Sequence, residues 1–231
     1  MRTVPGAVSR AVSRRAVLGG AVLRGALLGA ALAGLVAPHR GRAAGADPTV
    51  DEVAAPIRAL DDGLLAAMRA GKTESFPNRF NMLAPVIDRT FDLPGILRVS
   101  VGLRWDDIGA EQQASLMQVF RRFTVASYVA NFNSYDGQRF EIAPTLRAIG
   151  TDQVVGTTFV PQGGDANRID YVMRQEDATW KVVDVLLDGT ISRVAVQRSD
   201  FRGVLVHGGA PALIASLQRK VVDLAGGSLE S

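Results

Sequence analysis

Apolar residues repeat with helical spacing from residue 50 onward, first over 50–68 and then over about 75–89. This spacing is typical of amphipathic helices that bury one face. Gly71 separates the two predicted helices, and a break at Pro94-Gly95 followed by a short helix comes next. The longest predicted helix begins near Asp107, a good N-cap residue, and ends near Asn133. Its apolar stripe is broad, which predicts burial on more than one side.

After residue 138 the apolar period changes to two, which predicts strands over 139–149, 153–160, 168–175 and 180–188. The turns between them are short, so the strands are expected to form an antiparallel meander. Two helices follow, over 191–206 and 211–224, with Pro211 near a helix start and Gly226 just past its end. The order predicts an α+β fold with a curved antiparallel sheet of about four strands packed against N-terminal and C-terminal helices.

The first 46 residues differ from the rest of the chain, because they contain seven arginines and no Asp, Glu or Lys. A basic start, an apolar middle over 16–37 and a small-residue exit at 44–46 form the layout of an export signal. The pair Arg14-Arg15 resembles the twin-arginine signal of bacteria. We therefore predict a cleaved signal over 1–46, with cleavage after Ala44 or Ala46, and one domain over 47–231. The alternative is a permanent anchor helix, which the polar Arg24 and many glycines disfavour.

Removing this segment changes the sign of the charge. The full chain has a net charge of +3, but residues 47–231 hold 19 basic residues against 23 acidic ones, a net charge of −4. No basic patch with interleaved aromatic residues remains there, so a nucleic-acid partner is not expected. The predicted export places the domain in the periplasm.

Residues 47–231 offer few groups for catalysis or metal binding. They hold no cysteine and one histidine, His207, in a "VHGG" stretch that we interpret as a turn between two helices. No phosphate-binding glycine loop or calcium-loop spacing occurs, so neither a cofactor nor a metal is expected. The acidic pairs at 61–62 and 106–107 are interpreted as solvated or capping carboxylates.

Asp184 interrupts the apolar stretch "WKVVDVLL" and is the best candidate for an acid or base. One reading makes the protein a small isomerase or hydrolase on a cone-shaped sheet, with Asp184 as its acid/base group. The favoured reading is an edge position, or a carboxylate bonded to backbone or to an arginine, with the four candidates Arg98, Arg147, Arg193 and Arg198.

The stretch "FDLPGILRVSVGLRWDDIGAEQQASLMQVFRRFTVASYVANFNSYDGQRF" resembles the MlaC-type family of periplasmic phospholipid-binding proteins, also called toluene-tolerance auxiliary proteins. The pattern continues with "IDYVMRQEDATWKVVDVLLDGTISRVAVQRSDF" and ends in "GGAPALIASLQRK", so that it spans about residues 75–223. Where the family often reads Gly-Val-Ser-Leu-Val, this chain has Gly-Thr-Ile-Ser-Arg-Val at 189–194. A hopanoid-associated branch of the family also exists.

The resemblance implies a non-enzymatic carrier of phospholipid or hopanoid, with a lipid cavity between the sheet and the helices. Its expected partners are an inner-membrane ABC-type lipid transporter and an outer-membrane complex, and its expected role is in outer-membrane lipid asymmetry. The predicted lipid-binding residues are aromatic and aliphatic: Phe91, Phe120, Phe123, Tyr128, Phe132, Tyr171, Val183 and Val185. Besides the enzyme, a scaffold subunit of an envelope complex that binds no lipid is a third possibility.

Overall fold

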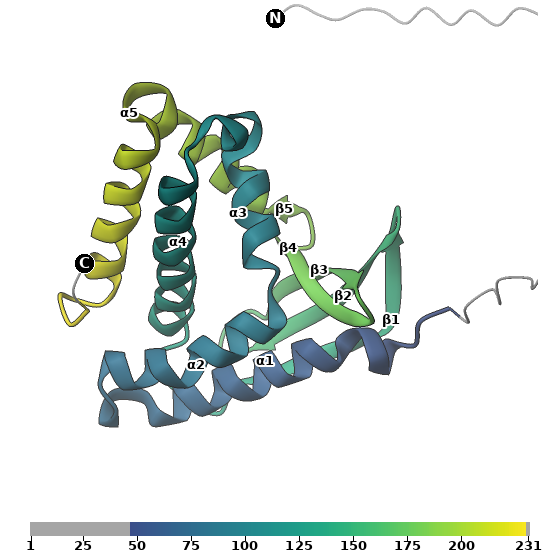
Figure 1. The fold of residues 1–231 in the computed structure, drawn as a ribbon. Helices are drawn as coiled ribbons and strands as arrows, with labels where there is room; N and C mark the ends of the chain where they lie inside the picture. The colour runs from purple at the N-terminus through teal and green to yellow at the C-terminus, as the bar shows by residue number, and fades with distance from the viewer. Residues whose placement is uncertain (1–46, 230–231) are drawn as a thin grey trace, which may run out of the picture. The chain divides into compact units, whose positions relative to one another are not determined.

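Helices that precede and follow the strands in the sequence pack against one side of a curved sheet built from the middle of the chain (Figure 1). The structure is a computed structural model that describes residues 47–229, so the predicted signal over 1–46 lies outside the described residues. The helices are α1 (Val50–Ala70), α2 (Phe76–Thr90), α3 (Leu93–Val101), α4 (Ala110–Asn131) and α5 (Arg193–Leu224). The strands are β1 (Arg139–Ile149), β2 (Asp152–Val160), β3 (Asn167–Glu176), β4 (Thr179–Leu187) and β5 (Ile191–Ser192).

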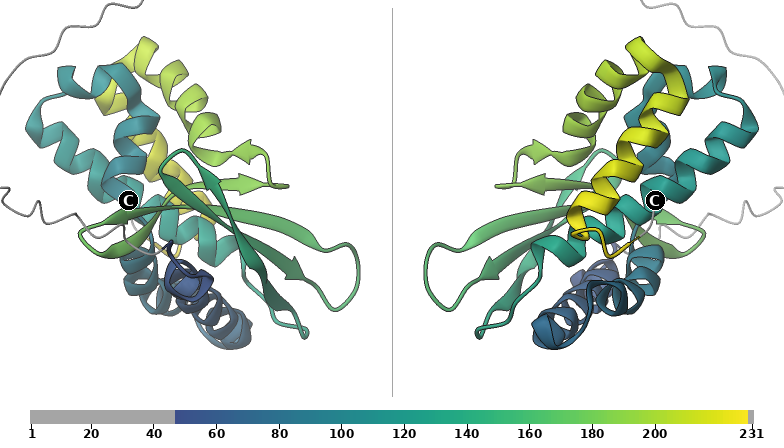
Figure 2. Two further views of the ribbon diagram at one scale, coloured as in Figure 1. Left: turned by 90° about the vertical axis from the view of Figure 1, so that its right-hand side faces the viewer. Right: turned by 90° about the vertical axis from the view of Figure 1, so that its left-hand side faces the viewer.

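The predicted α+β class and curved antiparallel sheet are confirmed, with one strand more than expected. The strands follow one another in the order β1-β2-β3-β4-β5, and every neighbouring pair is antiparallel. The fifth strand has two residues, and the helix predicted to begin at Ile191 therefore begins at Arg193. Figure 2 shows how strongly the long strands twist and bend.

α1 and α2 form an antiparallel pair across one side of the domain (Figure 1). A capping box starts α1, since Thr49 accepts from the Glu52 N–H and the Glu52 carboxylate accepts from the Thr49 N–H. The helix ends at Gly71, where φ is +48°, a conformation that favours glycine. Ile57, Leu60 and Leu64 are fully buried, as their spacing predicts.

Two helix starts differ from the sequence prediction. The break before α3 lies at Phe91-Asp92 and not at Pro94-Gly95, because Asp92 caps the helix by accepting from the Gly95 N–H at 2.9 Å. α4 begins at Ala110 with Gly109 as N-cap, and residues 102–107 form a 3-10 helix. Asp107 was therefore wrong as the helix start: an N-cap residue type indicates where a helix can begin, and the local turn decides where it does.

Side chains of alternate strand residues point to the helices and form the core with them. Val155, Tyr171 and Met173 are almost completely buried on this inner face. Two bulges interrupt the alternation. One lies in β1 between Ile142 and Leu146, around Pro144, and the other shifts the β3–β4 register at Val172/Met173.

The outer face of the sheet carries an ion-pair cluster. Asp170 is completely buried and accepts two hydrogen bonds from Arg168, both of 2.8 Å, and one of 3.3 Å from Arg147. Two exposed guanidinium groups thus cover one buried carboxylate. These hydrogen bonds and ion pairs offset the free-energy cost of burying the charged Asp170 carboxylate.

α5 consists of two helical halves that meet at Gly209, whose φ of +64° and ψ of −163° are not helical. Figure 2 shows the bend between the two halves. The turn predicted at "VHGG" is therefore confirmed. Within residues 47–229, no helix is long and apolar enough to cross a membrane, and no group of His, Asp and Glu side chains is arranged to hold a metal ion.

Candidate functional site

A cavity of about 450 Å³ lies between the helices and the inner face of the sheet. Its walls come from α3, α4, the start of α5, and strands β3 and β4. Twelve of the eighteen lining residues are apolar or aromatic: Phe91, Leu93, Ile96, Phe120, Phe123, Tyr128, Phe132, Ile169, Tyr171, Val185, Leu187 and Val194. Ligand cavities of this size with mostly apolar walls are typical of small-molecule binding sites.

α4 presents one continuous stripe to the cavity, with lining residues three or four positions apart from Phe120 to Asn131. Two members of the stripe are hydroxyl residues, but both donate within the helix. Thr124 donates to the Phe120 carbonyl at 2.9 Å, and Ser127 donates to the Phe123 carbonyl at 2.7 Å. Because these protons are already engaged, the wall behaves largely as an apolar surface.

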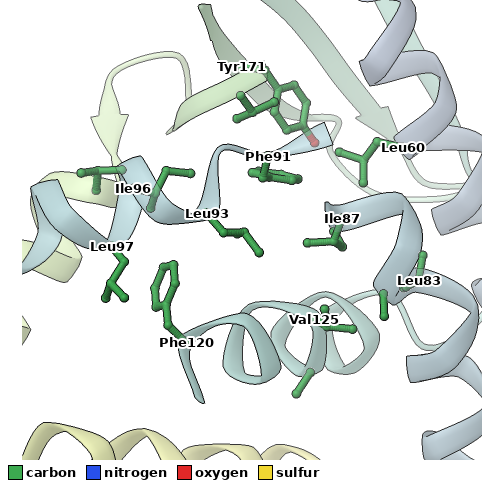
Figure 3. Close-up of a cluster of buried hydrophobic side chains, with 14 of the residues drawn as sticks. Leu60, Leu83, Ile87, Phe91, Leu93, Ile96, Leu97, Phe120, Val125 and Tyr171 are labelled. Atoms are coloured by element: carbon green, nitrogen blue, oxygen red, sulfur yellow. The ribbon is translucent and has the colours of Figure 1, made fainter. Parts of the chain in front are cut away.

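Aromatic rings form a chain along one side of the cavity. The Tyr128 ring lies 5.6 Å from Phe91 and 6.0 Å from Phe132, and Phe132 in turn contacts Phe159 at 5.7 Å. Such rings are large, rigid apolar surfaces. Figure 3 shows Tyr171 and Phe91 together with Leu93, Ile96 and Phe120, which approach the same interior space from the sheet and from the helices.

Seven of the eight residues predicted to bind lipid line this one cavity: Phe91, Phe120, Phe123, Tyr128, Phe132, Tyr171 and Val185. Val183 is not among the lining residues. The bulge explains this, because Met173 pairs with Val182 and Val172 pairs with Asp184, which leaves Val183 without a partner. Val182 takes the inward place instead and is completely buried. Contact of these side chains with a lipid stays a prediction.

Sequence reasoning missed several lining residues that the same periodicities could have found. Thr124, Ser127 and Asn131 share the helical face of Phe120, and Ile169 and Leu187 lie two residues from Tyr171 and Val185. Leu93, Ile96, Val194 and Gln197 come from helices whose orientation toward the cavity is set by tertiary packing. The sequence pattern contains no signal for that orientation.

Asp184 lines the cavity, but its carboxylate is engaged at the start of α5. Oδ1 accepts from the backbone N–H of Val185 at 2.8 Å and of Val194 at 3.1 Å, and Oδ2 accepts from the Ser192 hydroxyl. Of the readings left open by the sequence, the carboxylate bonded to backbone is the observed one, and none of the four candidate arginines pairs with it in the described residues.

A buried polar cluster lies against the two cavity tyrosines. Burial raises the pKa of Tyr128 and of Tyr171. The charge of Asp61 also raises both pKa values, so this carboxyl group lies within electrostatic range of both rings. Asp61 is only 6% exposed, and its Oδ1 has no hydrogen-bond partner. The interpretation of residues 61–62 as solvated or capping was therefore wrong for Asp61 and holds for the exposed Asp62.

The cavity reaches the surface where its lining residues are exposed, at Asn131, Leu187 and Arg193. These residues come from the end of α4, the end of β4 and the first turn of α5. The opening therefore lies between the helices and the β4–β5 edge of the sheet.

The fold and the cavity together define the class of protein: an α+β domain that holds one large apolar cavity between a curved open sheet and its helices. The chain belongs to the MlaC family, because the family model described as MlaC protein matches residues 58–219.

A solved structure with the same fold is the phospholipid-binding protein from Ralstonia solanacearum in complex with a phospholipid. It is 21% identical in sequence, the match covers 75% of this chain and 99% of that chain, and the TM-score is 0.66. No curated protein matches the chain.

Proposed function

We propose that this protein is a periplasmic lipid carrier that holds acyl chains of a phospholipid in the cavity and shuttles the lipid between inner-membrane and outer-membrane transport complexes. The observation that carries the proposal is the apolar cavity of about 450 Å³ that opens to the surface. Membership of the MlaC family and the bound phospholipid of a protein with the same fold support it.

The size of the cavity suits a bound ligand. Its volume of about 450 Å³ lies within the range of cavities that enclose most of a small ligand. The number of acyl chains on the bound lipid is therefore a property to measure.

The energetics suit a carrier. Moving a 16-carbon chain from water into an apolar cavity is favourable by about 0.8 kcal/mol per methylene, or about 13 kcal/mol in all. The chain is equally protected from water in a bilayer, so its transfer between bilayer and cavity is close to neutral. The protein needs no catalytic step, and the direction of transport is set by its partners.

Binding fits the site better than catalysis does. The Asp184 carboxylate is the only acidic group on the described lining. It accepts one hydrogen bond from the Val185 N–H within β4 and two from Ser192 and Val194 at the start of α5. A general base needs a free lone pair within reach of its substrate. We therefore propose that Asp184 fixes the start of α5 and does not act as an acid or base.

The compartment is part of the proposal. The basic start, the Arg14-Arg15 pair and the small-residue exit support export, and an exported protein without cysteine needs no disulfide for its fold. A hopanoid is the alternative cargo, and its mass separates it from any phospholipid.

Native mass spectrometry of protein purified without detergent tests the proposal. The wild-type protein is expected to carry a lipid, whose mass after organic extraction gives its class and number of chains. Val185→Glu places a charge on the cavity wall, where an unpaired carboxylate is costly, and is expected to abolish lipid retention.

Val206→Glu is the matched control, because Val206 is 53% exposed on α5 and is not a lining residue. It is expected to retain lipid at the wild-type level. Wild-type protein that carries no lipid and takes up none from vesicles would contradict the proposal.

A further inference from the structure

We propose that Arg193 forms an anion-binding site at the mouth of the cavity that holds the phosphate group of a lipid, with the side-chain amides of Gln197 and Asn131 as further donors. The inference rests on the lipid binding proposed above and assigns the polar part of the ligand. It makes the carrier selective for lipids that present a phosphate at the surface end of the cavity.

The position of Arg193 is the first support. Arg193 is the only cationic residue on the described cavity lining, and it lies in the first turn of α5 beside the opening. Its charge lowers the pKa of Tyr128 against the effect of burial, so the guanidinium group lies within electrostatic range of the cavity interior.

The second support is that the hydrogen-bonding capacity of Arg193 is unused. Among residues 47–229, Arg193 has no ion-pair partner and no side-chain hydrogen bond, whereas Arg147, Arg168 and Arg174 on the sheet are all paired. The one acidic residue nearby on the lining, Asp184, is engaged by Val185, Ser192 and Val194. A guanidinium group with five donors and no acceptor is suited to phosphate oxygens.

Two further lining residues, Gln197 and Asn131, carry side-chain amides that can donate. Gln197 contacts the Ser100 hydroxyl at 3.3 Å, and Ser100 donates its one proton to the Ile96 carbonyl at 2.7 Å. Even where one amide N–H of Gln197 is donated to the Ser100 oxygen, the second has no partner in the described residues. The Asn131 side chain is exposed and likewise has none. The hydroxyl protons of Thr124 and Ser127 are already donated to carbonyl groups of α4. The opening thus provides donors and one positive charge for an anion.

The start of α5 does not form this site through its backbone. The N–H of Val194 is donated to Asp184 and the N–H of Ala195 to the Ser192 hydroxyl. Selectivity therefore depends on the side chain of Arg193, which makes it open to test by substitution.

The test compares two lipids with identical chains, phosphatidylglycerol and diacylglycerol, each with one fluorescently labelled chain. Titration of delipidated full-length protein is expected to give about tenfold tighter binding of phosphatidylglycerol, the scale of one charge-assisted hydrogen bond. Arg193→Gln is expected to reduce this ratio to near one, and Arg193→Lys, which keeps the charge, to retain part of it.

Arg202→Gln is the matched control, because Arg202 is exposed on the same helix and is not a lining residue. It is expected to keep the wild-type ratio. Equal affinity of wild-type protein for the two lipids, or an unchanged ratio in Arg193→Gln, would overturn the inference while leaving lipid binding in place. Failure of both lipids to bind would instead contradict the proposed function.

A second arm separates the two sources of the phosphate. Inorganic phosphate alone is titrated into wild-type and Arg193→Gln protein, and binding is followed by phosphorus NMR. Binding that is lost in the variant indicates a site that takes phosphate by itself. No binding, together with the lipid preference, indicates a site that acts on phosphate only when the chain is held in the cavity. Both results support the anion site, and phosphate binding that is equal in the two proteins counts against it.

Discussion

Asp61 and Asp62 are adjacent acidic residues in opposite environments. Asp61 is buried within electrostatic range of Tyr128 and Tyr171, and Asp62 is exposed. Burial, together with a smaller effect of the Asp62 charge, raises the pKa of the Asp61 carboxyl from 3.8 to about 7. Because the folded pKa lies above the unfolded one, the folded state binds more protons between these two values, and the free energy of unfolding falls as the pH rises from about 4 to 7.

Replacing Asp61 by Asn removes this titration while keeping the shape of the side chain. The free energy of unfolding of Asp61→Asn is expected to exceed that of the wild type by about 2–4 kcal/mol at pH 8, and the difference is expected to vanish near pH 4. Urea unfolding at a series of pH values measures this. Asp200→Asn, at an exposed position on α5, is the control and is expected to change stability by less than about 0.5 kcal/mol at every pH. A stability difference that does not depend on pH would show that Asp61 is ionised in the folded protein.

The burial of Asp61 was partly readable from the sequence, and the displacement of Val183 was not. Asp61 lies four residues after Ile57 and three before Leu64, on the buried side of a helix, but an acidic residue there is more often solvated. Val183 has the same parity as Val185, and strict alternation would place both on the cavity wall. The bulge that breaks the alternation depends on the pairing of β3 with β4, which the sequence of β4 alone does not determine.

At the scale of elements, the bend in α5 depends on one glycine. Gly209 has a φ of +64° and separates the half of α5 that begins beside the cavity from the half that carries Lys220 over the Phe123 ring of α4. A side chain at this φ and ψ is strained even where there is space for it. The angle between the two halves of α5 therefore depends on the backbone conformation of Gly209.

Two glycine substitutions in α5 are expected to have opposite effects. Gly209→Ala is expected to lower the free energy of unfolding by about 1–3 kcal/mol, the cost of a strained backbone conformation. Gly203→Ala, at a helical position where a Cβ atom meets nothing within 4 Å, is expected to raise it by about 0.5–1 kcal/mol. Thermal and urea denaturation of the two variants measure both. A stabilised Gly209→Ala protein would mean that α5 can straighten without strain.

The spacing of apolar residues along the sequence predicted which helices and strands form, but it predicted their first and last residues less accurately. Strand β1 has the predicted bounds, and the other long strands differ by one or two residues, because short turns fix where alternation stops. The start of α4 was misplaced, since the 3-10 helix over 102–107 continues a helix-like pattern into a different conformation. Strand β5 was missed because two residues are too few for any period.

At the scale of the whole molecule, the carrier role proposed above gives lipid transfer no preferred direction. A chain that leaves a bilayer for an apolar cavity exchanges one apolar environment for another, so the proposed carrier is expected by itself only to speed equilibration. The sequence predicted a cavity only through its resemblance to a family. The spacing of apolar residues shows which side chains face the interior, but it does not show whether those side chains fill the interior or leave a space.

Transfer between two vesicle populations tests this neutrality. With labelled phospholipid in one population, the purified protein is expected to move label until both populations of equal composition hold the same fraction, and to accumulate it in neither. Fluorescence dequenching over time measures the exchange. Val185→Glu is expected to slow it to the rate without protein, and a lasting imbalance would show that the protein itself drives transport.

Strand β1 forms one edge of the open sheet, and its bulge between Ile142 and Leu146 surrounds Pro144. Proline has no N–H to offer an incoming strand, and a bulge bends the edge away from the flat geometry that a neighbour would match. Arg139 and Glu141 add charges along the same edge. These features of β1 disfavour pairing of its edge with a strand of another copy of the chain. The open sheet is therefore expected to resist edge-to-edge aggregation even at high protein concentration.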